Sequence, residues 1–160
     1  MINNHKKLEL NEVLSISCIR HDIHCHSKKR VLEIISELTA TQMNLPKKII
    51  FDAIQAREKM GSTGIGNGIA IPHGTLDNNT LQTVGAFIRL ENPIVFDAID
   101  NQPVDLVFAL LVSTDKCKTH LHTLSVVAKT LGNKKILTRL RSARSNEDLY
   151  KIITEKHHII

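Results

Sequence analysis

The sequence predicts a single α/β domain. Two stretches have the apolar pattern of β-strands, and several others repeat apolar residues at helical spacing. The chain has 160 residues, which by length alone is about one domain and is enough to bury a core. We find no internal repeat, linker or low-complexity tract that would divide residues 1–160.

Two helices are expected in the first third of the chain. Ser27 suits the N-cap of the first helix, which runs to about Asn44. Pro46 suits the first turn of the second helix. The expected core face of that helix consists of Ile49, Ile50, Ala53 and Ile54. Arg57 follows one turn later, so it should emerge from the buried side where the chain enters a glycine-rich loop.

A short apolar strand is expected at Ile69–Ile71, after the glycine-rich loop, and two longer strands and three further helices complete the predicted domain. Residues 83–90 have the pattern of a strand, with the apolar side chains of Val84, Ala86 and Ile88 on one face. Residues 104–112 are longer and almost entirely apolar, a pattern typical of a central strand covered on both faces. The later helices are expected at about 120–131, 136–141 and 145–153, the last beginning with a capping box. In the first of them, apolar residues recur at helical spacing at Leu121, Leu124, Ala128 and Leu131.

The most specific segment runs from Arg57 through a glycine-rich loop to a single histidine. Pro72 and Gly74 bracket His73, which fixes one accessible imidazole in place. Backbone N–H groups of the loop can approach an anion closely, and the Arg57 guanidinium matches phosphate oxygens. The loop residues expected to support a phosphate are Ser62, Thr63, Gly64 and Gly66. The alternative is a flexible turn beside a buried structural histidine.

The glycine loop does not match the two common nucleotide-binding motifs. It lacks the Gly-Lys-Ser/Thr of a Walker A motif and does not match Gly-x-Gly-x-x-Gly. Nucleotide binding is therefore poorly supported.

A second histidine pair opens the helix expected at residues 120–131. His120 and His122 point about 200° apart on a helix, so they cannot hold one metal ion together. His120 shares a side with Leu124 and Val127, which places it at the edge of the core. We expect His120 to assist His73 beside a helix N-terminus. A purely structural role at the helix start is the alternative.

A third group of histidines lies between His21 and His26 and surrounds Cys25. These are metal-ligating residue types. In an extended segment, however, His24 and His26 face opposite to Cys25, and no second Cys/His pair has a zinc spacing. We therefore expect a solvated strand end, with no metal site and no cofactor. A small metal-binding protein is kept as the least favoured functional hypothesis.

Composition limits the classes of partner. Twenty-one Lys+Arg against sixteen Asp+Glu leave a net charge of +5, and the basic stretch at 134–144 is either a solvated helix face or a surface for an acidic partner. One Tyr and four Phe are too few for nucleic-acid stacking platforms. The longest apolar run, 106–112, is far shorter than a membrane span, and the N-terminus lacks a signal core. We therefore expect a cytoplasmic protein with reduced thiols that binds neither nucleic acid nor membrane.

The segment Gly64–Gly74 resembles the phosphorylation-site signature of the fructose/mannitol-type enzyme IIA family of the bacterial phosphotransferase system. The segments Asp97–Asp105 and Lys118–Leu124 narrow the resemblance to the nitrogen-regulatory branch of that family. The resemblance spans about residues 8–153. It implies a mixed β-sheet flanked by helices on both faces.

The resemblance also implies a chemistry. His73 is the matching phosphoryl acceptor, Arg57 and His120 match the supporting arginine and second histidine, and Thr75 stands where relatives often carry a basic residue. A covalent phosphohistidine forms without a metal, because neutral imidazole is both a good nucleophile and, once phosphorylated, a good leaving group. Positioning and charge stabilisation are then the main tasks of the protein.

The implied donor is a histidine-phosphorylated carrier protein, the nitrogen-branch phosphocarrier. The implied targets are regulatory partners in nitrogen and carbon metabolism and in potassium uptake. The alternative is a sugar-transport enzyme IIA component that passes its phosphate to an enzyme IIB. In either case a partner is expected to dock over an apolar surround made of Ile65, Ile69 and Ile71.

Overall fold

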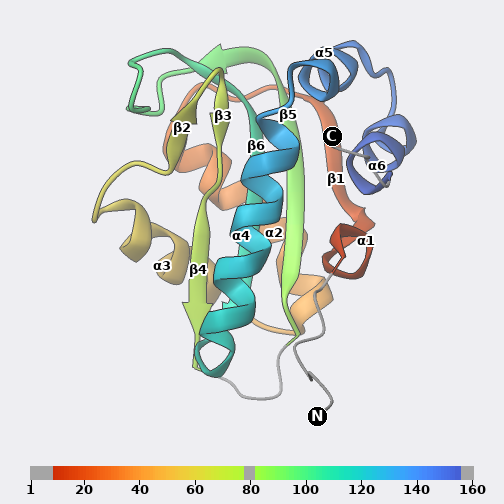
Figure 1. The fold of residues 1–160 in the computed structure, drawn as a ribbon. Helices are drawn as coiled ribbons and strands as arrows, with labels where there is room; N and C mark the ends of the chain where they lie inside the picture. Colours follow the sequence, from red (N-terminus) through yellow and green to blue (C-terminus); the bar gives the residue numbers. More distant parts are fainter. Residues whose placement is uncertain (1–8, 78–81, 156–160) are drawn as a thin grey trace.

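The computed structural model describes residues 9–77 and 82–155, with residues 117–119 described by their backbone only. Within this part of the chain a six-stranded mixed sheet forms the middle layer (Figure 1). Its strands are β1 (Leu14–Ile23), β2 (Gly64–Gly66), β3 (Ile69–Ala70), β4 (His73–Leu76), β5 (Val84–Ile94) and β6 (Val104–Ser113).

The strand order is β1-β5-β6-β3-β2, and β4 also pairs with β6. Strands β5 and β6 are antiparallel, whereas β1 is parallel to β5. Strands β3 and β4 are both parallel to β6, and they follow one another along the same edge of it. The short break between them contains Pro72, whose carbonyl accepts from Leu110 N at 3.0 Å. His73 therefore opens a strand at the rim of a fixed sheet.

Helices cover both faces of the sheet (Figure 1), as the resemblance implied. They are α1 (Leu10–Val13), α2 (Lys28–Met43), α3 (Lys47–Glu58), α4 (Cys117–Leu131), α5 (Lys134–Ser142) and α6 (Asn146–Thr154), with a 3₁₀ turn η1 at Thr114–Lys116. Helices α2 and α3 pack on one face, and α1, α4, α5 and α6 pack on the other. Strand β6 contributes alternate residues to the two cores, which confirms the predicted central strand covered on both sides.

Helix boundaries follow the predicted capping residues. Ser27 Oγ accepts from Arg30 N at 3.1 Å, and Asn44 ends α2 in the left-handed region with φ 53°. Ser145 Oγ accepts from Asp148 N at 3.0 Å at the start of α6. Each cap supplies a partner to a backbone N–H or carbonyl that the helix itself leaves unpaired.

The structure corrects several local predictions. Pro46 is the N-cap of α3 and not a residue of its first turn. Ile49 and Leu121 are exposed, because the buried stripe of α3 runs through Ile50 and Ile54, and that of α4 runs through other positions. Of strand β1 only the end near His21–His26 was predicted, since two register shifts against β5 remove the simple alternation from its buried residues.

No helix among the described residues is long and apolar enough to cross a membrane. The histidines near the C-terminus, in residues 156–160, lie outside the described part of the chain.

Candidate functional site

A buried carboxylate anchors the glycine loop to the end of α3. The Glu58 side chain is 5% exposed, and its two oxygens accept from Thr63 N at 3.0 Å and Thr63 Oγ1 at 2.7 Å. Lys28 Nζ lies 2.7 Å from Glu58 Oε1 and 4.7 Å from the centre of the Phe96 ring. The loop therefore starts from a fixed point that joins α2, α3 and the segment after β5.

The loop hydroxyls are used to build the loop. Ser62 Oγ donates to the Phe96 carbonyl at 2.7 Å and accepts from Gly64 N at 3.0 Å. Thr63 Oγ1 donates to Glu58. Sequence reasoning expected both hydroxyls to face a phosphate, but the structure directs both protons to the scaffold.

The loop glycines are required by close approach and by backbone shape. A Cβ on Gly64 would lie 2.6 Å from Ala98 Cβ, so only glycine fits there. Gly66 has φ +102°, which other residues rarely adopt. The next amide, that of Asn67, donates to Asp100 Oδ2 at 3.0 Å. The glycines thus shape the loop, and its amides at Gly64 and Asn67 already have partners.

Close packing of α3 on β4 brings Arg57 to His73. A Cβ on Gly74 would lie 3.1 Å from the backbone of Ala53 and Ile54, so this glycine sets the helix-to-strand distance. Arg57 Nε then donates to His73 Nε2 at 3.2 Å, and Arg57 Nη1 donates to the Gly61 carbonyl at 2.9 Å.

The protonation of the His73 ring follows from its other contact. His73 Nδ1 lies 2.9 Å from the Ile71 carbonyl, which can only accept. Nδ1 therefore carries the proton, and Nε2 has the lone pair that the Arg57 N–H faces. The pKa of His73 is lowered, first by burial and also by the Arg57 charge. The hydrogen bond to the Ile71 carbonyl and the Glu58 charge act in the opposite direction and raise it. The ring is neutral at pH 7 and presents one nucleophilic atom.

His120 lies beside His73 from the opposite side of the sheet edge. The two ring centres are 5.4 Å apart at an interplanar angle of 53°. His120 is 8% exposed, and its Nδ1 has no hydrogen-bond partner among the described residues. Burial, and then the nearby His73, lowers the pKa of His120 to about 4. The structure thus brings Arg57, His73 and His120 together, and His122 lies farther toward solvent.

Exposed apolar side chains adjoin these residues along the chain. The exposed fractions are 83% for Met60, 45% for Ile65, 85% for Ile99 and 67% for Leu121. Ile99 N donates to the Gly64 carbonyl at 3.3 Å, which ties its loop to the glycine loop. We name Met60, Ile65, Ile99 and Leu121 the apolar rim.

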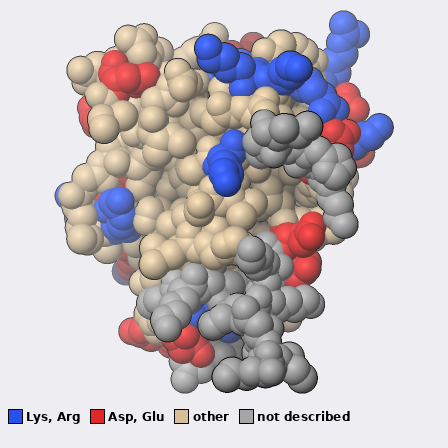
Figure 2. Space-filling model, in the orientation of Figure 1, with Lys and Arg blue, Asp and Glu red and all other residues tan. Residues whose placement is uncertain are grey.

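The apolar rim replaces part of the surround expected from sequence. Ile69 and Ile71 were expected there, but both are buried in the core. The face over β2, β3, β4 and α4 carries few charged side chains in Figure 2. Lys and Arg gather instead at the upper right of that view, over α5, where Arg139 pairs with Glu155 and Arg141 with Asp105.

The side chains of the His21–His26 segment have different surroundings. His24 is exposed and pairs with Glu91, whereas Cys25 is buried, as the alternation predicted. His21 Nδ1 lies 2.6 Å from Asn146 Oδ1. No three His, Cys, Asp or Glu side chains within residues 9–77 and 82–155 are placed to hold a metal ion together.

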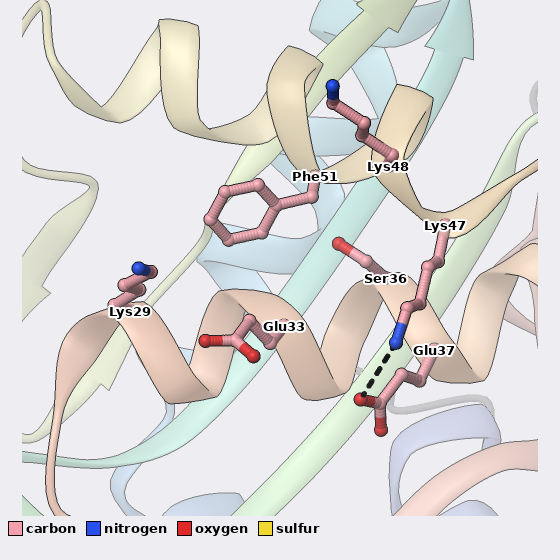
Figure 3. A pocket seen from close by; sticks show the side chains of 7 residues that line it. All are labelled: Lys29, Glu33, Ser36, Glu37, Lys47, Lys48 and Phe51. Atoms are coloured by element: carbon pink, nitrogen blue, oxygen red, sulfur yellow. Dashed lines mark ion pairs between the residues drawn. The ribbon is translucent and has the colours of Figure 1, made fainter.

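A separate hollow of about 260 Å³ lies between α2 and α3 (Figure 3). Phe51 projects between the two helices, with lysines and glutamates around it. Lys47 Nζ lies 3.8 Å from Glu37 Oε1 across this hollow. None of its seven lining residues belongs to the His73 site.

Glu58 and Lys28 are the residues that sequence reasoning missed. One signal was available for Glu58. It lies four and eight residues after Ile54 and Ile50, on the buried stripe of α3, where a carboxylate requires partners.

Comparison with known proteins gives consistent matches over nearly the whole chain. The family model described as "Phosphoenolpyruvate-dependent sugar phosphotransferase system, EIIA 2" matches residues 12–156. The chain is 65% identical over 155 residues to the nitrogen regulatory protein of Klebsiella oxytoca, covering 97% of this chain and 96% of that protein. For the nitrogen regulatory protein of Escherichia coli strain K12 the identity is 64% over 155 residues, covering 97% and 95%. The solved structure of nitrogen regulatory protein IIA-Ntr from Neisseria meningitidis aligns with a TM-score of 0.86 at 40% identity, covering 91% of this chain and 99% of that one.

Proposed function

The chain belongs to the EIIA 2 family of the phosphoenolpyruvate-dependent sugar phosphotransferase system, and on that premise we propose that His73 carries its phosphoryl group. Membership supports a phosphocarrier role for the chain as a whole. The observation that carries the proposal for His73 is the state of its ring: Nδ1 donates to the Ile71 carbonyl, which leaves the Nε2 lone pair facing Arg57.

The proposed reaction transfers a phosphoryl group between two imidazoles. The Nε2 lone pair of His73 attacks phosphorus, the N–P bond of the donor phosphohistidine breaks, and the donor imidazole leaves with that electron pair. The His73 proton stays on Nδ1, hydrogen-bonded to the Ile71 carbonyl, throughout. No proton transfer and no metal are needed to balance this step, so positioning and charge stabilisation are left to the protein.

Arg57 and His120 are proposed to stabilise the transferred group. In the unphosphorylated protein the Arg57 Nε–H donates to the lone pair of His73 Nε2. As that lone pair forms the new N–P bond, the Arg57 guanidinium turns from Nε2 to the phosphoryl oxygens. His120 is a neutral imidazole with a buried ring nitrogen that lacks a partner among the described residues. A phosphoryl oxygen would supply that partner. Ser62, Thr63, Gly64 and Gly66 support the site through the shape of the loop.

The proposed donor is a histidine-phosphorylated carrier protein of the nitrogen branch. Its proposed docking surface is the apolar rim, whose four side chains are exposed. Phosphorylation would add about −1.5 to −2 charges to that surface, by analogy with other phosphorylated residues. A second partner that docks there by apolar contact would have to desolvate this charge, so it should prefer the unphosphorylated form.

We therefore infer a regulatory phosphocarrier whose partners distinguish its two states. The names of the two similar regulatory proteins support nitrogen regulation as the output. The family resemblance points to targets in nitrogen and carbon metabolism and in potassium uptake, with the exchange placed in the cytoplasm.

The deciding experiment is incubation with a phosphoenolpyruvate-driven carrier chain, followed by mass spectrometry of the intact protein and its peptides. We expect one acid-labile phosphate, located on His73, and none in His73→Ala, whose fold should persist because the site loop is held by other residues. His122→Ala is the matched control. Labelling of His73→Ala at the wild-type level would assign the acceptor elsewhere. Onward transfer to an enzyme IIB would favour the sugar-transport alternative.

A further inference from the structure

We propose that Glu58 is a positioning residue for phosphoryl transfer, whose buried carboxylate fixes Thr63 and, through it, the Ile71 carbonyl that orients the His73 ring. The inference rests on the proposed acceptor role of His73. It adds a residue on the far side of the loop that does not itself touch the His73 ring in the described hydrogen bonds.

An unbroken series of hydrogen bonds joins the Glu58 carboxylate to the imidazole. Glu58 accepts from Thr63 N and Thr63 Oγ1 at 3.0 and 2.7 Å. The Thr63 carbonyl accepts from Ile71 N at 3.0 Å. The Ile71 carbonyl then accepts from His73 Nδ1 at 2.9 Å. Every link has ordinary length, so displacement of Thr63 moves the acceptor that holds the ring.

The backbone of Glu58 also limits where Arg57 can lie. Gly61 N donates to the backbone carbonyl of Glu58 at 3.2 Å, and the Gly61 carbonyl accepts from Arg57 Nη1 at 2.9 Å. The loop that Glu58 fastens is therefore also the loop that holds the guanidinium. Both groups aimed at the transferred phosphoryl depend on one anchor.

Helix packing alone does not require a buried charge at this point. Elsewhere between α2 and α3, Lys47 and Glu37 join the same two helices as an exposed pair at 3.8 Å (Figure 3), an arrangement of little energetic consequence. Lys28 and Glu58 form a largely buried pair, which costs more desolvation and is weak evidence for stability. The carboxylate is instead suited to a geometric task, because it accepts both donors of Thr63 at once.

Charge gives the proposal a second readout. The groups that face His73 are Arg57 and Glu58 from α3 and His120 from α4. Among them, Glu58 raises the pKa of His73. Loss of the carboxylate should therefore lower this pKa further, an effect that loosened packing alone would not produce.

The test is Glu58→Gln, which keeps the size of the side chain and removes its charge. Ring ¹⁵N chemical shifts of unphosphorylated protein report the His73 tautomer and pKa. We expect the Nδ1–H form to dominate in wild type and to lose population in Glu58→Gln, together with a lower pKa. The initial transfer rate from the carrier protein should fall by up to roughly 100-fold, the cost of a small misplacement of the reacting group. Asp22→Asn, which removes the remote ion pair to Arg89, is the matched control and should change none of these.

Two results would overturn the proposal. One is a Glu58→Gln protein with lower thermal stability but wild-type tautomer, pKa and transfer rate, which would make Glu58 purely structural. The other comes from Thr63→Val, which serves as the deciding test in the event that Glu58→Gln fails to fold. It removes only the hydroxyl contact, and an unchanged His73 tautomer there would refute the proposed path. The tautomer measurement needs no donor, so it can fail or succeed independently of phosphate mapping to His73.

Discussion

Replacing Arg57 tests the central contact of the site, because this side chain has two simultaneous tasks. Its Nε–H faces His73 Nε2 at 3.2 Å, and its Nη1–H holds the Gly61 carbonyl at 2.9 Å. In Arg57→Ala both are lost, and with them one charged contact to the transferred group. Removing one such transition-state donor costs roughly 10²–10³-fold in rate, or about 3–4 kcal/mol. We expect a loss of that size in the initial transfer rate.

Arg57→Lys should recover only part of this loss. A lysine ammonium is a compact charge without a planar fork, so it cannot hold the Gly61 carbonyl and face Nε2 in the same way. The two variants also separate charge from catalysis. Arg57 lowers the pKa of His73, so its removal should raise that pKa and move the midpoint of the pH–rate profile upward, even though transfer is slower.

The assay is quench-flow transfer from the phosphorylated carrier protein, read by mass spectrometry across pH 5 to 9, roughly the range in which histidines titrate. Arg30→Ala is the matched control, because Arg30 is an exposed arginine that pairs with Glu33 and Glu37. A transfer rate for Arg57→Ala within about twofold of wild type would remove Arg57 from the mechanism, since one charged contact is worth far more.

Two further predictions concern acid stability and partner binding. The pKa of His120 is lowered from 6.5 to about 4, so the folded state binds fewer protons there than the unfolded state. The free energy of unfolding should therefore fall by about 3 kcal/mol as pH drops from about 6.5 toward 4, for a shift of this size. Urea unfolding of wild type and His120→Gln at both pH values measures this loss. An equal loss of unfolding free energy in the two proteins would contradict the assignment. His73→Asp should weaken a partner that docks on the apolar rim, whereas His73→Ala should not, because only the former places a carboxylate where apolar contact requires desolvation. Affinity capture with both variants and with both phosphorylation states measures this, and identical partner sets throughout would argue against state-dependent regulation.

Much of the fold was predictable because its signals are local. The caps at Ser27 and Ser145 act within three residues. The continuous apolar run of β6 predicts that both faces of this strand are buried. The candidate site was also visible locally, since His73, its flanking Pro72 and Gly74, and Arg57 lie in one segment. The membership in the EIIA 2 family confirms the resemblance that this segment carried.

Other features were not visible because they depend on partners distant in sequence. Strand β1 has no clean alternation, and its pairing with β5 includes register shifts that only the assembled sheet defines. The exposure of Leu121 follows from the rotation of α4 against the sheet, whereas the inward side of His120 was predicted from its spacing to Leu124 and Val127. The same rotation brings two imidazoles within 5.4 Å across 47 positions of the chain.

The amino-acid sequence by itself determined the residue types of the site and the short elements that present them, because caps, glycines and proline act on neighbouring backbone. The tertiary structure decided what those residues face. Ser62 and Thr63 turn their hydroxyls to Phe96 and Glu58, since a loop packed against a buried ion pair must satisfy its own polar groups first. The protonated nitrogen of His73 was likewise decided in three dimensions, because the Ile71 carbonyl lies against one side of the ring and the Arg57 N–H against the other.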